Sequence, residues 1–119
     1  MGGTVQQSRV NVRRVTGAAV IELVGEHDLS TVPSLDDALG RIRPEEARVV
    51  DLSAATFIDS SILTTLVGAA SRDGGAAATV MVAPPGSAAA RLFELTRAAA
   101  AMSVYESADA ALAGVMIRE

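Results

Sequence analysis

Three polar residues, Asp59, Ser60 and Ser61, interrupt the apolar stretch AATFIDSSILTTLVGAA at residues 54–70. The carboxylate and the two hydroxyls suit two kinds of chemistry. The side chain of Asp59 or Ser60 can cap a helix by accepting a hydrogen bond from a free backbone N–H. One cap is enough for a helix, and Leu63 stands where a capping box would have Glu or Gln. The serine hydroxyls are therefore candidate sites of modification as well as candidate caps.

A phosphate on Ser60 would change the surface of the protein more than its core. It adds about −1.5 to −2 charges at neutral pH. The free N–H groups and the positive end of a helix tolerate an anion, so we expect the fold to survive. The carboxylate of Asp59, and that of Asp28 if its loop is close, would repel the phosphate. This chemistry predicts a binding face that negative charge switches off.

Catalysis is the rival interpretation of the same residues. His27, the single histidine, could act as the base for a serine, with Asp28 or Asp59 as the orienting acid. However, adjacent His27 and Asp28 cannot easily align imidazole and carboxylate, and the chain has no Gly-x-Ser-x-Gly elbow. We expect His27 to be a partly exposed loop residue and the protein not to be an enzyme. The sequence also contains no metal-ligand spacing and no cofactor motif.

The first half of the chain has the pattern of an α/β domain. Residues 9–15 and 19–25 are typical of the two strands of a hairpin. Apolar residues at steps of three and four from Leu29 to Ile42 predict an amphipathic helix, with Pro33 in its first turn. The next two elements are a buried parallel strand ending at Leu52 and a helix after Ser61 whose apolar face holds Ile62, Leu63, Leu66, Val67 and Ala70.

The second half continues the alternation of strands and helices. It predicts a strand at residues 77–83, a helix at 87–96 with Leu92, Phe93 and Leu95 inward, a strand at 103–106 and a helix at 107–117 capped by Ser107. The run RAAAAM at residues 97–102 extends a helix in this interpretation. The order predicts a mostly parallel sheet with the hairpin at one side and about four helices over it. Sites in such sheets form where loops leave the carboxyl ends of strands, which is where we place Asp59 to Ser61.

Composition narrows the functions further. The 119-residue chain has no cysteine and a net charge of −4, which indicates one domain without disulfides and disfavours nucleic acid as a partner. No apolar run approaches the about 18 residues that cross a membrane. All ten cations are arginine, a bias that we attribute to a GC-rich bacterial genome. The absence of cysteine suits a reducing cytoplasm, and we expect a cytoplasmic protein. Residues 1–8 are interpreted as a flexible leader before a single domain at 9–119.

The segment VVDLSAATFIDSSILTTLVGA resembles the signature of the STAS domain, in particular that of bacterial anti-sigma factor antagonists. That signature has an apolar strand, Asp-Leu-Ser, Phe-Ile-Asp-Ser-Ser-Gly-Leu and a helix rich in Ala and Leu. The earlier segment GEHDLSTVPSLDDAL is similar to the family's Gly-Glu-Leu-Asp segment, and RLFELT and MSVYESADAALA look like its late helices. The resemblance covers nearly the whole chain from about Val10 and implies a STAS-like α/β fold.

The resemblance implies a switch protein. In the family, the unphosphorylated antagonist binds an anti-sigma factor that is also a GHKL-type serine kinase, and this binding frees the sigma factor. The kinase then phosphorylates the serine after the aspartate, and a PPM-type phosphatase resets it. Carried over to this sequence, the phosphoacceptor is Ser60, with Ser61 as the alternative. The partner-binding face comprises Asp28, Asp59, Ser61, Ile62 and Thr64.

One residue departs from the family pattern, because Ile62 replaces the usual glycine. Glycine permits close backbone approach, whereas isoleucine is bulky and stiff. We expect Ile62 either to hinder the kinase or to add an apolar contact that selects a different partner. The alternative function is that of a STAS scaffold or adaptor module in a stressosome or lipid-transport complex, without a phosphorylation switch.

Overall fold

A mixed β-sheet forms the centre of the molecule, as described for residues 8–15, 17–72 and 78–116 of the computed structural model. Its strands are ordered β1-β2-β3-β5-β6, and β4 pairs with β2 off this path. The bounds of the strands are β1 Arg9–Val15, β2 Ala18–His27, β3 Ala47–Asp51, β4 Ala55–Ile58, β5 Thr79–Val82 and β6 Val104–Tyr105. The hairpin of β1 and β2 is antiparallel and the other pairs are parallel, as the sequence predicts.

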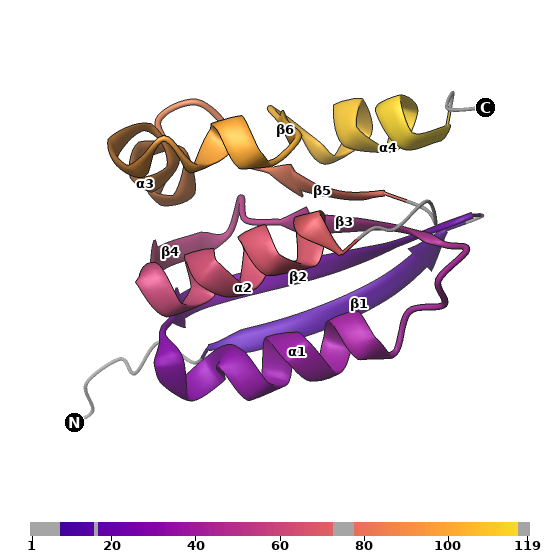
Figure 1. Ribbon diagram of the computed structural model, residues 1–119, viewed down its shortest axis with the longest axis horizontal. Coiled ribbons are helices and arrows are strands. Elements are labelled where there is room, and N and C mark those ends of the chain that lie inside the picture. The colour runs from indigo at the N-terminus through magenta and orange to yellow at the C-terminus, as the bar shows by residue number, and fades with distance from the viewer. Residues whose placement is uncertain (1–7, 16, 73–77, 117–119) are drawn as a thin grey trace.

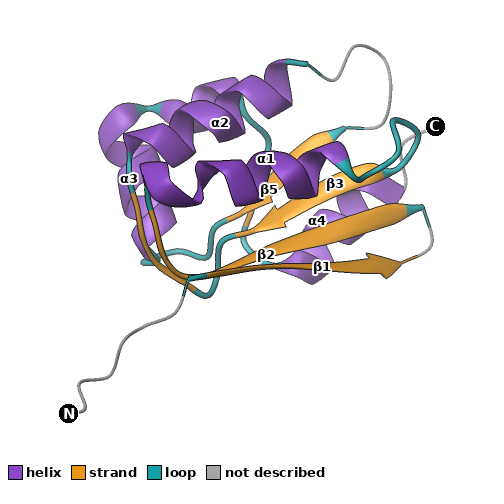
Figure 2. Cartoon of the chain, turned by 90° about the horizontal axis from the view of Figure 1, so that it is seen from below, coloured by secondary structure: helices purple, strands orange, loops and turns teal. Residues whose placement is uncertain are grey.

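Four α-helices cover the sheet (Figure 2). They are α1 Val32–Gly40, α2 Ser60–Ser71, α3 Ala88–Thr96 and α4 Ala108–Met116, and short 3-10 turns lie at Leu29–Thr31 (η1) and Ala98–Ala101 (η2). Helices α1 and α2 lie on one face of the sheet and α4 lies on the other. Helix α3 lies at the end of the sheet where β4 pairs with β2 (Figure 1). The strands on which a helix packs are not always its chain neighbours, because α3 packs on β4 and α4 contacts β3, β5 and β6.

Two apolar clusters hold these layers together, one on each face of the sheet. The larger cluster packs the strand residues Ile21, Leu23 and Val50 against buried side chains of α1, α2 and α3, which are Leu35, Ile62, Leu66 and Phe93. The smaller one packs Ala111 of α4 against Val20, Val49, Val80 and Val82. Because β2, β3 and β5 carry apolar residues on both faces, they form the rigid platform from which the loops at their carboxyl ends project.

Three expectations for the elements need correction. The helix after Gly25 begins as a 3-10 turn, and Leu29 in that turn is 69% exposed instead of buried. Leu95 is 80% exposed, because it lies on the side of α3 opposite Phe93, which carries the buried face. The RAAAAM run does not extend α3, since Arg97 adopts a left-handed conformation with φ of 60° and the chain restarts as η2.

Other predicted features lie at the edges of the described residues. Ser107 caps α4 as expected, because its Oγ accepts a hydrogen bond from the backbone N–H of Ala110 at 3.1 Å. Residues 1–7 of the predicted leader, and 73–75 of the turn after α2, lie outside the described residues. Ser8, at the end of the predicted leader, donates a hydrogen bond to the carbonyl oxygen of Glu26.

Candidate functional site

The two loops that carry the predicted site leave neighbouring strands at the same edge of the sheet. Strand β4 pairs in parallel with β2, and His27 is directly opposite Ile58. Asp28 follows the last residue of β2 and Asp59 follows the last residue of β4, so the loops that they begin lie side by side. The sequence predicts Asp59 in the loop after the strand that ends at Leu52, but in the structure the additional strand β4 lies between that strand and Asp59. Strand β4 is therefore the element that brings Asp59 beside Asp28.

Asp59 is the N-cap of α2. Its Oδ1 accepts hydrogen bonds from the backbone N–H groups of Ser61 at 2.9 Å and Ile62 at 3.1 Å. The capping interpretation thus holds for the aspartate, which leaves the serines free of that task. Ser60 is the first residue of the helix and is exposed. Its hydroxyl makes no hydrogen bond within the part of the chain that the structure describes.

The other candidate residues of α2 differ in exposure. Ser61 is partly buried, whereas Thr64 is exposed one turn further along the helix. The Oγ1 of Thr64 donates a hydrogen bond to the carbonyl oxygen of Ser60 at 2.8 Å, and Thr65 does the same to Ser61 at 3.0 Å. Ser60 and Thr64 therefore form an exposed edge of the helix, and Ser61 turns toward the body of the domain.

Ile62, expected on the partner-binding face, lies in the interior of the described structure. Its side chain has no exposed surface, because it points from α2 into the cluster beneath α1 and α2. Periodicity already put this position on the apolar face of the helix, while its place in the family motif suggested the surface. The packing decides in favour of the core, so the unusual residue changes the interior and leaves the exposed edge of α2 unaltered.

Asp28 begins a capped turn. Its Oδ1 accepts hydrogen bonds from Ser30, at 2.6 Å from the hydroxyl and 2.9 Å from the backbone N–H. Thr31 completes a capping box, because its Oγ1 accepts a hydrogen bond from the Asp28 N–H at 3.1 Å. The Ser30 hydrogen bonds, and the nearby His27, hold the pKa of the exposed Asp28 carboxyl below its ordinary value. Asp28 therefore presents a negative charge at neutral pH.

His27 is buried, not partly exposed, because it is the last residue of β2 and its side chain faces the covered side of the sheet. One ring nitrogen, Nε2, lies 3.0 Å from the carbonyl oxygen of Val24. The other, Nδ1, lies 3.1 Å from the Oγ1 of Thr31. With both nitrogens engaged in this way, the imidazole is not paired with either serine. The geometry therefore gives the nucleophile–base interpretation no support.

Two exposed apolar side chains near the acidic loops escaped the sequence interpretation as surface residues. Phe57 of β4 is 50% exposed and pairs in register with Glu26, and Leu29 follows Asp28 in the capped turn. Phe57 lies in the family motif, but its exposure follows from strand β4, which the sequence did not indicate. These side chains and the polar ones with exposed surface form a candidate surface for partner binding, which we call the docking face: Asp28, Leu29, Phe57, Asp59, Ser60 and Thr64.

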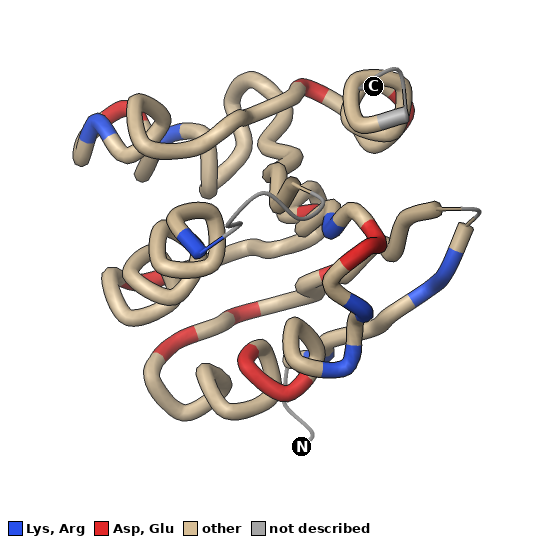
Figure 3. The backbone as a smooth tube through the Cα atoms, turned by 45° about the vertical axis from the view of Figure 1, so that its right-hand side comes forward, with Lys and Arg blue, Asp and Glu red and all other residues tan. Residues whose placement is uncertain are grey.

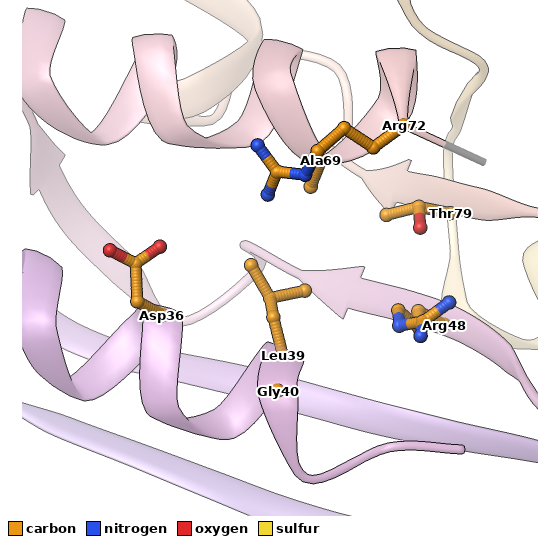
Figure 4. Close-up of a pocket in the computed structure, with 7 residues that line it drawn as sticks. All are labelled: Asp36, Leu39, Gly40, Arg48, Ala69, Arg72 and Thr79. Carbon is orange, nitrogen blue, oxygen red and sulfur yellow. The ribbon is translucent and has the colours of Figure 1, made fainter. Parts of the chain in front are cut away.

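A pocket of about 250 Å³ lies at the opposite end of the molecule, between the C-terminal ends of α1 and α2 (Figure 4). Its polar residues include Asp36, Arg48, Arg72 and Thr79, and Leu39 forms part of its apolar wall. Arg48 donates a hydrogen bond to the carbonyl oxygen of Ile42 at 3.2 Å, beyond the end of α1. The pocket is remote from Ser60, because it lies at the C-terminal end of α2 and Ser60 is the first residue of that helix.

Neither a metal site nor a membrane span is found in the part of the chain that the structure describes. Within those residues, no group of three or more acidic or histidine side chains is placed to hold a metal ion. The described helices are also too short or too polar for one of them to cross a bilayer.

Comparisons with known proteins agree with this architecture. The family model of the STAS domain matches residues 9–111. An anti-sigma factor antagonist from Mycobacterium paratuberculosis has a solved structure that is 30% identical, with a TM-score of 0.83 over 92% of this chain and 95% of its own. The anti-sigma factor antagonist SpoIIAA in its unphosphorylated form is 18% identical, with a TM-score of 0.67 over 92% and 100%, and shares the fold. A search of curated proteins gave no match.

Proposed function

The chain belongs to the STAS domain family, and we propose that it acts as an anti-sigma factor antagonist that phosphorylation of Ser60 switches off. In its unphosphorylated form it binds an anti-sigma factor, which is also a GHKL-type serine kinase, and so releases a sigma factor. The kinase inactivates the antagonist by phosphorylating Ser60, and a PPM-type phosphatase restores it. The protein works by docking and not by catalysis of its own.

The observation that carries this proposal is the position of the Ser60 hydroxyl. Ser60 is exposed at the start of α2, and its hydroxyl is not engaged with the described residues. The neighbouring cap is supplied by Asp59, so modification of Ser60 leaves the N-terminal hydrogen bonds of the helix in place. A kinase can therefore reach this oxygen without opening the fold. Ser61 is partly buried and is the weaker acceptor.

The transfer step and its consequence follow from ordinary phosphoryl chemistry. The Ser60 oxygen forms a bond to the γ-phosphorus of ATP, the bond from that phosphorus to the bridging oxygen breaks, ADP leaves, and the hydroxyl proton passes to the kinase or to water. The product adds about −1.5 to −2 charges. That charge faces Asp59 and Asp28 on its own chain and ADP on the kinase, so like charges oppose one another across the contact.

The apolar part of the docking face supplies contact area for the partner. Leu29, in the turn after Asp28, and Phe57, two residues before Asp59, are both exposed. Burial of exposed apolar surface contributes about 25 cal/mol per Å² to association before the costs of binding are subtracted. We infer that these two side chains hold the anti-sigma factor while Ser60 lies opposite its nucleotide. In this proposal Leu29 and Phe57 contribute most of the binding affinity, and the neighbouring Ser60 carries the phosphate that switches binding off.

The test of this function uses the purified protein, ATP and candidate anti-sigma kinases from the same organism. Mass spectrometry identifies the modified residue, and calorimetry or surface plasmon resonance measures docking. We expect phosphate on Ser60, docking retained by Ser60→Ala, and docking weakened by Ser60→Asp, which carries roughly one charge where phosphate carries nearly two. Ser61→Ala is the matched control and should be phosphorylated normally.

Two results would contradict this function. Phosphorylation that persists in Ser60→Ala and disappears in Ser61→Ala would move the acceptor to the second serine. Docking to an anti-sigma factor that is indifferent to both substitutions at Ser60 would remove the switch and favour an unswitched STAS scaffold or adaptor module.

A further inference from the structure

The pocket between the C-terminal ends of α1 and α2 is not used by the docking and phosphorylation proposed above. It has a volume of about 250 Å³, and buried residues of three elements line it: Leu39 of α1, Ala69 of α2 and Thr79 of β5. Two cationic side chains also line it, Arg48 of β3 and Arg72, which directly follows α2 (Figure 4). The pocket therefore brings two positive charges beside buried surface, away from the docking face.

The register of the sheet directs Arg48 into this pocket. Arg48 pairs with Thr79 in the ladder between β3 and β5, and Val50 pairs with Met81 two residues further along. Val50 and Met81 belong to the cluster beneath α1 and α2. Because alternate residues of a strand share a face, Arg48 and Thr79 lie on that same face, at the amino ends of their strands. The fold thus holds a partly buried arginine at one end of the pocket.

Arg72 reaches the pocket from the exposed end of α2. Figure 4 shows its side chain directed back along the helix. Its Nη1 lies 3.3 Å from the position that a Cβ on Gly68 would occupy, so the missing side chain at Gly68 gives the guanidinium its room. On the α1 side the pocket is bounded by Gly40, where an added Cβ would meet no atom within 4 Å. Two glycines thus leave the space that the guanidinium and a ligand can occupy.

Neither guanidinium has a carboxylate partner among the described residues, whose two ion pairs involve other arginines. Arg48 donates one hydrogen bond from Nη2 to the carbonyl oxygen of Ile42, and the side chain of Arg72 donates none within the described part of the chain. An arginine side chain carries several N–H donors. The bond to Ile42 explains why Arg48 lies at the end of α1, but it leaves the other donors of Arg48 and those of Arg72 available to a ligand.

Asp36 limits what the pocket accepts. It is the acidic residue of the lining, and Figure 4 shows its carboxylate at the end of the pocket away from Arg48. The last carbonyl groups of α1 and α2 add partial negative charge nearby. These groups oppose an anion, but two arginines against one aspartate leave the lining positive. The pocket therefore suits a small molecule with a single anionic group, placed toward Arg48.

We propose that this pocket binds a small oxyanion, a molecule whose phosphate or carboxylate group is held by the guanidiniums of Arg48 and Arg72. A guanidinium suits both groups, because its planar array of N–H donors matches two oxygens of either one. The volume is below the about 300–1,000 Å³ of pockets for drug-sized ligands, so the ligand is small. This site involves neither Ser60 nor the docking face, and it stands independently of the function proposed above.

Nuclear magnetic resonance of the full chain tests the site, with inorganic phosphate and acetate as separate probes at an ionic strength held constant with NaCl. The amide resonances of Gly40, Arg48 and Thr79 and the Nε–H resonances of Arg48 and Arg72 should shift and saturate. Charge-assisted contacts from two guanidiniums predict a dissociation constant on the order of 1 mM for the better probe. The tighter of the two probes identifies the ligand group as phosphate or carboxylate. Shifts that fail to saturate with either probe would overturn the proposal.

Charge variants separate this pocket from a general attraction of anions to arginine. Arg48→Gln and Arg72→Gln should each weaken binding about tenfold or more, as the loss of a charge-assisted contact predicts. Asp36→Asn should tighten binding, because it removes the opposing charge. Arg43 is exposed and lies outside the lining, so Arg43→Gln is the matched control and should leave binding unchanged. Equal losses for Arg43→Gln and Arg48→Gln would overturn the proposal.

A variant that fills the pocket tests the cavity while every charge is retained. Gly40→Leu introduces a side chain where a Cβ meets no neighbouring atom, at a helical residue whose φ is not positive. The variant should therefore fold, and circular dichroism should show a melting temperature no lower than that of the wild type. Binding of both probes should be lost. Binding that survives in folded Gly40→Leu would show that the anion lies outside this pocket and would overturn the proposal.

Discussion

At the scale of single residues, Asp59 and Ser60 divide two tasks that one polar residue could have combined. The Asp59 carboxylate holds the first N–H groups of α2, and the Ser60 hydroxyl is left exposed beside it. A helix start that depended on the serine would lose its cap when the serine was phosphorylated. In this arrangement the structural group and the modifiable group are adjacent but independent, which lets charge change without melting the helix.

Substitutions of Asp59 separate its cap from its charge. Asp59→Ala removes both and should lower the free energy of unfolding by about 1 kcal/mol, the usual value of an N-cap side chain. Asp59→Asn keeps an oxygen that accepts the N–H bonds of Ser61 and Ile62 and should stay within a few tenths of a kcal/mol of the wild type. Urea unfolding followed by circular dichroism measures both. Equal losses for Ala and Asn would show that the charge, and not the cap, stabilises α2.

At the scale of elements, the sequence predicted the helices and the central strands because each has a strong period or a compact apolar run. Helix α2 and strand β3 are of this kind. Strand β4 was missed because four residues, buried at Ala55 and Ile58 and exposed between them, have neither a helical nor an alternating pattern. Its existence depends on pairing with β2, which is a long-range contact that local sequence does not encode.

The candidate site, like the secondary structure, was predictable in part. The motif identified Asp28, Asp59 and Ser60, whose positions at the ends of neighbouring strands follow from the topology. The burial of His27 was not predictable from the motif, because its neighbours Glu26 and Asp28 are exposed and its direction depends on the register of β2. The helical period, in contrast, places Ile62 on the apolar face of α2. Polarity suggested a surface histidine, and the Val24 and Thr31 oxygens are what make its burial possible.

The packing of Ile62 makes a graded stability prediction for α2. Its side chain is fully buried between the helices and the sheet, so Ile62→Val should cost about 0.5–1.5 kcal/mol and Ile62→Ala about 2–5 kcal/mol. Chemical denaturation measures these losses. Docking per folded molecule should be unchanged in Ile62→Val, since this side chain does not reach the surface. A docking defect in that variant without loss of stability would restore Ile62 to the binding face.

At the scale of the whole molecule, charge is distributed unevenly between the two ends of the sheet (Figure 3). Residues 15–40 and 49–71, which carry most of the docking face, contain no arginine or lysine. Five arginines gather toward the other end, at the hairpin tip, the amino end of β3 and the ends of α1 and α2: Arg14, Arg41, Arg43, Arg48 and Arg72. A phosphate on Ser60 therefore finds no cation within these segments to neutralise it.

The central claim is that charge on Ser60 blocks docking while the domain stays folded. The most direct measurement compares the protein phosphorylated stoichiometrically at Ser60 with the unmodified protein, in docking affinity and thermal unfolding together. We predict docking weakened by about 100-fold or more, as expected when like charges meet across an interface. The melting temperature should shift by no more than about 5 °C, which corresponds to about 1 kcal/mol in a domain of this size. Undiminished docking of the phosphorylated protein, or its unfolding at ordinary temperature, would contradict the account.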